Sequence, residues 1–284
     1  MSAVAKATPA VARYAAALRY ELSVRNEAYA KTHQLKHQAS YGSQPVICYE
    51  PDGQCHGNFL PRAYRAILAN PLWARRLRKA HTSARTALPR NDRGFWCELD
   101  SSNSSDALLM NVFCYPGVFD DGRVITLLGL ESGAVPEFGF KARVPLQEGK
   151  FDRTEVDMRL GSLLLEAKLT EADFQTRERE IVENYRDFAG VFDRKALPKV
   201  KDRYLSYQLI RNVLAAVAHD CAFCVLCDQR RPDLLQAWYE IMRCVRPADL
   251  RVRCKILTWQ ELAAVLPQQL RDFLEEKYGI LGNL

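Results

Sequence analysis

Apolar and charged side chains alternate most regularly between residues 155 and 169. Val156, Met158 and Leu160 alternate with charged residues, which is the period-two pattern of a half-buried strand. The alternation resumes after Gly161-Ser162 and continues to residue 169. Glycine suits the first position of a two-residue hairpin loop because it tolerates positive φ. The pattern therefore predicts two antiparallel strands joined by a tight turn.

The register of this hairpin brings two carboxylates together. If Gly161 and Ser162 form the loop, Asp157 lies opposite Glu166, with Cβ atoms about 4.5–5.5 Å apart. Adjacent carboxylates repel each other, and Mg²⁺ or Mn²⁺ removes that cost because these ions prefer hard oxygen ligands. Lys168 follows Glu166 on the same face and can place an ammonium beside a metal-bound water or a phosphate. These residue types are typical of metal-assisted phosphodiester hydrolysis. A solvated hairpin face is the alternative interpretation of the same residues.

The rest of the chain predicts a mixed α/β (α+β) sheet with helices on both sides. Helices are expected over residues 9–38, 61–68, 71–84, 104–115, 170–188, 202–218 and 232–246, after the Thr258–Glu261 capping box, and over 267–278. Further strands are expected over residues 124–130, 138–144, 222–226 and 251–257. Thr170 is the expected N-cap of its helix. In the 202–218 helix, Gln208, Arg211 and Asn212 share one face.

A polar, helix-breaking stretch at Leu88–Arg93 predicts a domain boundary. Residues 1–92 form a helical region, which we interpret as an arm that grips the substrate or joins two copies of the chain into a homodimer. Residues 93–284 form the second domain. The helix expected over 71–84 carries four clustered cations: Arg75, Arg76, Arg78 and Lys79. A basic helix can track a phosphate backbone, and a solvated helix face is the alternative.

Four stretches resemble one superfamily of enzymes. Asp157, eight intervening residues and then Glu166-Ala167-Lys168 are similar to the D…ExK signature of the PD-(D/E)XK nucleases. The stretches that resemble its bacterial restriction-endonuclease-like members are Ser104–Phe113, Thr170–Phe174 and Tyr207–Asn212. The matches occur in the expected order over about residues 95–260, and residues 1–90 are outside the resemblance.

The resemblance implies a fold and a set of roles for the second domain. The implied fold is a restriction-endonuclease-like αβββαβ core. The implied metal ligands are Asp157, Glu166 and the Ala167 carbonyl, while Lys168 orients or helps to deprotonate the attacking water and stabilises the transition state. Gln208 and Arg211 are expected to contact the scissile phosphate or the water. An additional upstream acid is usual in the superfamily, and Glu137 is our candidate, with Glu98 second.

Composition indicates the class of protein and the compartment that suits it, but it does not identify a function. Hydrophobic residues make up 48% of the 284 residues, which is ordinary for a globular protein. The net charge of +6 permits a nucleic-acid partner without requiring one. No apolar run reaches the length of a membrane span. Nine cysteines, an odd number, favour a reducing cytoplasm over a disulfide framework.

A metal or iron–sulfur site is one interpretation of the closely spaced cysteines Cys221, Cys224 and Cys227. On a strand, residues three apart point to opposite faces, so Cys224 cannot converge with the other two. Buried core thiols are therefore the expected outcome. His33 and His37 are four residues apart on the first expected helix, a spacing that could hold a metal. We expect them instead to be exposed surface residues.

Three hypotheses follow. The first is a metal-dependent nuclease, with DNA as the expected substrate and RNA left open. The second is a non-catalytic module on the same fold that binds nucleic acid or a protein. The third is a metal or iron–sulfur protein centred on Cys221–Cys227.

Overall fold

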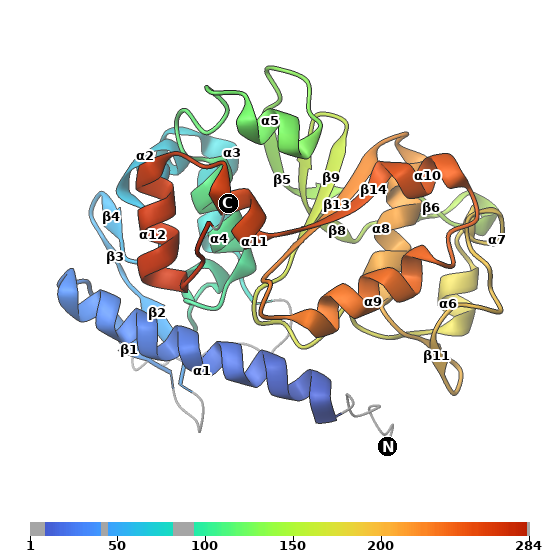
Figure 1. Cartoon of the computed structure of the whole chain (residues 1–284), viewed down its shortest axis with the longest axis horizontal. Coiled ribbons are helices and arrows are strands. Elements are labelled where there is room, and N and C mark those ends of the chain that lie inside the picture. Colours follow the sequence, from blue (N-terminus) through green and yellow to red (C-terminus); the bar gives the residue numbers. More distant parts are fainter. Residues whose placement is uncertain (1–8, 41–44, 82–93, 283–284) are drawn as a thin grey trace. The chain divides into compact units, whose positions relative to one another are not determined.

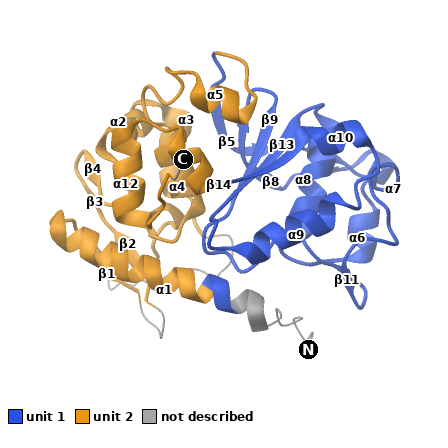
Figure 2. Ribbon diagram, in the orientation of Figure 1, with its two compact units in different colours: residues 1–15, 133–258 blue, residues 16–132, 259–284 orange. Residues whose placement is uncertain are grey.

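The computed structural model describes residues 9–40, 45–81 and 94–282 (Figure 1). Contacts divide the chain into two compact units (Figure 2). Unit 1 contains Gly133–Thr258 and the first turns of helix α1, and unit 2 contains Ala16–Ser132 and Trp259–Leu284. This division differs from the expected domains 1–92 and 93–284, whose boundary lies outside the described residues.

A five-stranded mixed sheet is the centre of unit 1, in the order β14-β13-β9-β8-β5. Its strands are β5 (Pro136–Lys141), β8 (Glu155–Leu160), β9 (Leu163–Ala167), β13 (Ala222–Cys227) and β14 (Cys254–Thr258). Strands β5, β8 and β9 pair antiparallel, whereas β9, β13 and β14 pair parallel. Central strand β9 is buried along its whole length. Because β9 pairs with β8 on one side and with β13 on the other, its backbone is held by hydrogen bonds from both sides.

The β8–β9 hairpin has the register that the alternation predicts. Leu160 pairs with Leu163, and Met158 pairs with Leu165. Gly161 has φ +59°, a left-handed conformation that glycine adopts without a steric penalty. The tight turn therefore fixes which side chains of the two strands share a face.

Helix α8 packs against this sheet within one apolar cluster of unit 1. Leu209 and Val213 of α8 belong to the same buried cluster as Leu164, Phe223 and Val225 of the sheet. The larger helices of unit 1 are α8 (Tyr207–Ala218), α9 (Pro232–Met242) and α10 (Ala248–Arg253). Short elements complete it: β6 (Val144–Pro145), β7 (Phe151–Asp152), β10 (Arg177–Glu178), α6 (Arg179–Glu183), α7 (Phe188–Val191), β11 (Lys199–Val200) and β12 (Arg203–Tyr204).

Unit 2 is mainly helical. Its helices include α1 (Pro9–Thr32), α2 (Pro61–Ala69), α3 (Pro71–Ala74), α4 (Ser105–Phe113), α5 (Arg123–Leu128), α11 (Trp259–Ala264) and α12 (Gln268–Tyr278). Its short strands are β1 (His37–Ala39), β2 (Ile47–Tyr49), β3 (Pro51–Asp52) and β4 (Cys55–His56). Helices α1 and α12 contact each other in this unit, because Lys277 Nζ donates to Asn26 Oδ1 at 2.6 Å. Helix α12 therefore belongs with α1 and not with the sheet that precedes it.

Three expected elements are wrong. The helix expected over 71–84 ends as a single turn, α3, followed by a 3-10 turn at Arg75–Arg78. Residues 124–130 are not a strand: Arg123–Leu128 forms helix α5, with left-handed Gly122 and Gly129 at its two ends. Residues 170–188 are not one helix either, since the chain runs irregularly from Thr170 to β10 and then forms only α6 and α7. In the described parts of the chain, no helix has both the length and the apolar character that crossing a membrane requires.

Candidate functional site

The hairpin places Asp157 and Glu166 on one face of the sheet. Arg159 pairs with Leu164 and Met158 with Leu165, so continuing the same register brings Asp157 beside Glu166. Asp157 Oδ2 also accepts a hydrogen bond from the backbone N–H of Ala167 at 2.8 Å. The Asp157 carboxylate is therefore bound to the last residue of β9, Ala167, whose carbonyl is the expected third ligand.

Glu166 is held at both of its carboxylate oxygens. Its side chain is only 1% exposed. Lys168 Nζ donates to Oε1 at 2.7 Å, and Asn212 Nδ2 donates to Oε2 at 2.8 Å. A buried carboxylate needs such partners to compensate for the water that it loses.

The Lys168 ammonium is buried and remains charged. Burial acts to lower the pKa of Lys168, but the nearby carboxylates of Glu166, Glu171 and Asp157 outweigh it and raise that pKa above its usual range. The ammonium also lies 5.7 Å from the ring centroid of Phe174. Lys168 is therefore a fixed cation in this structure.

Helix α8 supplies the neighbours of Glu166. Arg211 is 3% exposed, and its Nε and Nη2 both donate to Asn212 Oδ1, at 3.0 and 2.9 Å. Its Nη2 also donates to the backbone carbonyl of Glu155 at 2.9 Å. Sequence reasoning placed Asn212 on the polar face of Gln208 and Arg211, for which the resemblance favours a role beside the metal, but it gave Asn212 no role of its own. Gln208 Oε1 is buried and has no hydrogen-bond partner among the described residues.

The segment after Lys168 is held by Arg231, which sequence reasoning did not find. Arg231 is fully buried and follows β13. Its guanidinium donates to the carbonyls of Leu169, Glu171 and Ala172 at 3.3, 2.7 and 3.1 Å. Its Nε and Nη2 also bind the two Asp233 carboxylate oxygens at 2.9 and 2.7 Å. No local pattern reveals these contacts, because they join segments about 60 residues apart.

The donor set of the hairpin fits a hard divalent cation. Two carboxylates and a backbone carbonyl are oxygen ligands of the kind that Mg²⁺ and Mn²⁺ take. Each Glu166 oxygen already accepts one hydrogen bond, and a carboxylate oxygen has a second lone pair for a metal. Among the described residues, no three or more His, Cys, Asp and Glu side chains converge as a metal cluster. The fit therefore depends on Asp157, Glu166 and the Ala167 carbonyl.

The two candidates for an upstream acid occupy different environments. Glu137 on β5 is exposed and pairs in register with Arg159. This position puts Glu137 on the face of Asp157, with the Arg159 side chain directly opposite it. Glu98 lies in unit 2, where its Oε1 accepts a hydrogen bond from Lys79 Nζ at 2.9 Å. The pKa of Glu98 is raised by burial, which Lys79 only partly offsets.

The four basic residues of the expected DNA-binding helix divide into two pairs. Arg76 and Lys79 both bind Asp106 Oδ2, at 2.8 and 2.6 Å. Burial would raise the pKa of Asp106, but the two cations outweigh it and hold that pKa below its usual range. Arg75 and Arg78 are exposed. Half of the predicted basic patch is therefore engaged in partly buried ion pairs within unit 2.

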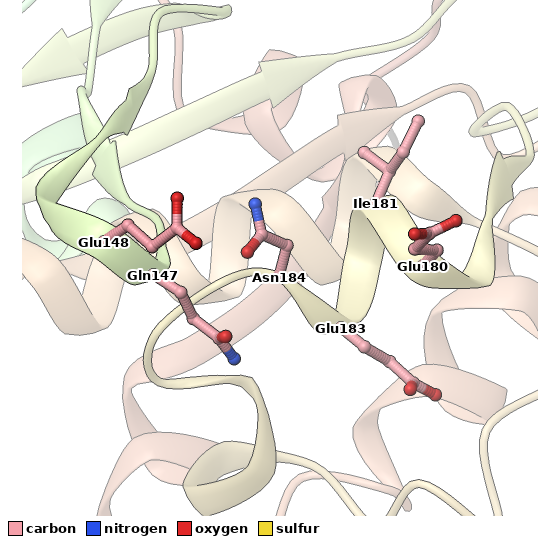
Figure 3. Close-up of a pocket in the computed structure, with 6 residues that line it drawn as sticks. All are labelled: Gln147, Glu148, Glu180, Ile181, Glu183 and Asn184. Carbon is pink, nitrogen blue, oxygen red and sulfur yellow. The ribbon is translucent and has the colours of Figure 1, made fainter.

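The remaining candidate residues and the main pocket have surroundings of their own. The thiols of Cys221, Cys224 and Cys227 are buried and are not joined in disulfides among the described residues. His33 Nε2 lies 2.7 Å from Glu276 Oε1, and His37 follows the end of α1. A pocket of about 540 Å³ is lined by Gln147, Glu148, Glu180, Ile181, Glu183 and Asn184. Figure 3 draws these six side chains. The carboxylates of the pocket repel phosphate, and none of the expected site residues lines it.

The comparisons with known proteins place the chain in a family. The family model described as Restriction Endonuclease associating with ARP matches residues 28–279. No curated protein and no solved structure matches the chain. The match covers both units and extends well beyond the stretches that carry the resemblance. Because it spans most of the 284 residues, the chain belongs to this restriction-endonuclease-like family.

Proposed function

We propose that the protein is a metal-dependent nuclease of the PD-(D/E)XK type that hydrolyses phosphodiester bonds in DNA. The observation that carries the proposal is the contact of 2.7 Å between the Lys168 ammonium and Glu166, with Asp157 beside them in the hairpin. Family membership supports a nuclease-related role. The family description also names an association with ARP, and we propose that this chain shares that partner.

Asp157, Glu166 and the Ala167 carbonyl would hold Mg²⁺ or Mn²⁺. When bound, such an ion supplies Lewis acidity and lowers the pKa of a coordinated water. The chain's contribution is to hold the ligands in place. The Ala167 N–H anchors Asp157, and two donors anchor Glu166.

Lys168 and Gln208 complete the proposed chemistry. As a fixed cation, Lys168 stabilises the negative charge that develops on the phosphate oxygens and orients the attacking water. It acts through its charge, because the surrounding carboxylates keep the ammonium protonated. The buried Gln208 Oε1 is an acceptor without a protein donor in the described chain, and it is suited to a hydrogen bond from that water.

Substitution of Lys168 tests the proposal. Lys168→Met keeps most of the side-chain volume and removes the charge, so we expect at least a hundredfold loss of Mg²⁺-dependent DNA cleavage. Lys150→Met is the control, because the Lys150 side chain is 71% exposed and pairs with exposed Glu148. Equal cleavage by the two variants, both folded by circular dichroism, would reject the assigned role.

A binding module is the second candidate, and burial of the site favours it. Glu166 and Lys168 are 1% and 4% exposed, as expected of an ion pair whose role is structural. The exposed Arg75 and Arg78 would then contact nucleic acid. DNA binding that weakens steeply with salt, without cleavage by any divalent metal, would favour this function.

A further inference from the structure

Asn212 connects helix α8 to the carboxylate at the centre of the candidate site. It is fully buried, and its side chain hydrogen-bonds to two charged side chains, Arg211 and Glu166. We propose that Asn212, oriented by Arg211, is a positioning residue that fixes the Glu166 carboxylate for metal binding. Arg211 then acts through Asn212 and does not touch the substrate. This inference rests on the proposed function.

Arg211 determines which way the Asn212 amide points. A guanidinium has only donors, so the oxygen of the amide must face it. Two hydrogen bonds, of 3.0 and 2.9 Å, converge on Asn212 Oδ1 from Arg211. The amide nitrogen is thereby directed at Glu166 Oε2, 2.8 Å away. A reversed amide would set its oxygen against the carboxylate and its N–H₂ against the guanidinium.

The Arg211 side chain is buried and binds groups of the protein interior. It is 3% exposed, which leaves almost no surface for a phosphate contact. Its Nη2 donates to the Glu155 carbonyl, two residues before Asp157 on β8. The same nitrogen lies 4.0 Å from Glu166 Oε2. The helix is therefore tied to β8 through Arg211 and to β9 through Asn212, the two strands that carry the proposed ligands.

The consequence is a carboxylate that cannot turn freely. Lys168 holds one oxygen of Glu166 and Asn212 holds the other. Binding a metal then costs little side-chain ordering, because the ligand is already in place. Partners that orient a metal ligand in this way typically change metal affinity by about 10–100-fold when they are removed.

Asn111 provides a matched control. It is also fully buried on a helix, and it makes three hydrogen bonds, with Leu60 N–H and the carbonyls of Asn58 and Ala107. It lies in unit 2, whereas Asn212 lies in unit 1. Asn111→Ala removes comparable contacts without touching the proposed ligands.

The test is a calorimetric titration of the full chain with Mn²⁺, with DNA cleavage measured in parallel. Asn212→Ala is expected to weaken Mn²⁺ binding about 10–100-fold, whereas Asn111→Ala binds as the wild type does. Asn212→Ser, which is too short to span Arg211 and Glu166, repeats the test if the alanine variant does not fold. Arg211→Lys is expected to weaken Mn²⁺ binding and to leave the KM for DNA unchanged.

Three results overturn the argument at different points. Wild-type Mn²⁺ affinity in folded Asn212→Ala rejects the inference and leaves the proposed function standing. A raised KM with unchanged Mn²⁺ affinity in Arg211→Lys assigns Arg211 to the substrate. A wild-type chain that neither binds Mn²⁺ nor cleaves DNA rejects the proposed function itself.

Discussion

Replacing Arg231 by methionine tests how the segment that follows Lys168 is held. The substitution keeps an unbranched apolar stem and removes the guanidinium. Three backbone carbonyls and the Asp233 carboxylate lose their donor. We expect a lower free energy of unfolding, together with reduced cleavage, because the carbonyls belong to Leu169–Ala172, the four residues that directly follow Lys168.

The magnitude follows from burial. The side chains of Arg231 and Asp233 are 0% and 3% exposed, so the variant leaves a buried carboxylate without its cation. Breaking a buried ion pair from one side costs about 3–5 kcal/mol. The carbonyls of Glu171 and Ala172 add little, because these residues are partly or fully exposed and water can replace the lost donor. We therefore expect a loss of about 4 kcal/mol.

Urea unfolding measures this loss, with Arg186→Met as the control. Arg186 binds both oxygens of Asp187 at 3.1 and 2.9 Å, but its side chain is 61% exposed. An exposed pair contributes about 0–1 kcal/mol, so the control should be nearly as stable as the wild type. A loss below about 1 kcal/mol for Arg231→Met would refute the reasoning, because it is the value for a surface pair.

Two further substitutions test other parts of the structure. Asp106→Asn removes a carboxylate whose pKa is lowered below 3.8, so its stabilising effect is present above that pH and is lost as the pH falls through the folded-state pKa. Urea unfolding should show a loss of about 3 kcal/mol at pH 7 and a smaller difference at pH 3; equal differences would contradict the ion-pair account. Gly161→Ala should cost about 1–2 kcal/mol in thermal unfolding because its φ of +59° is left-handed. The added Cβ would lie 3.5 Å from Ala134 Cβ, which is an ordinary contact, so the expected cost comes from the left-handed backbone. An unchanged melting temperature would therefore argue against this turn.

The hairpin was predictable because its information is local. The alternation around Val156–Leu160 sets the face of each side chain, and Gly161 sets the register. Short apolar runs are less informative. Residues 124–130 are compatible with a buried strand or a helix by composition alone. Gly129, at the C-terminal end of α5 with φ +62°, was the sequence signal for the helix.

The segment after Lys168 was not predictable from its own residues. Thr170 and the acidic residues after it are typical of a helix start. In the folded chain, Arg231 instead binds the carbonyls of Leu169, Glu171 and Ala172. This partner lies about 60 residues away in sequence, so local propensity gives no sign of it.

The division into units was also not predictable, because it depends on contacts between residues that are distant in sequence. Composition around Leu88–Arg93 indicates a linker, but contacts group Trp259–Leu284 with Ala16–Ser132. One of the contacts responsible joins Lys277 to Asn26, 251 residues apart. Long-range packing therefore decides which helices share a core, and a one-dimensional pattern does not contain it.

The candidate site was partly accessible from sequence. Spacing alone brought Asp157, Glu166 and Lys168 together, because all three lie on one hairpin and its end. Asn212 reaches Glu166 only through the packing of α8 on the sheet. That contact required the tertiary structure.

The most direct test of the proposed function is cleavage of plasmid and single-stranded DNA by the purified chain with Mg²⁺, Mn²⁺ or EDTA, with Lys168→Met run alongside. The proposal predicts cleavage with either metal, none with EDTA, and at least a hundredfold less with the variant. Lys150→Met should cleave as the wild type does. Cleavage that persists in EDTA, or that Lys168→Met retains in full, would contradict the proposed role of Asp157, Glu166 and Lys168.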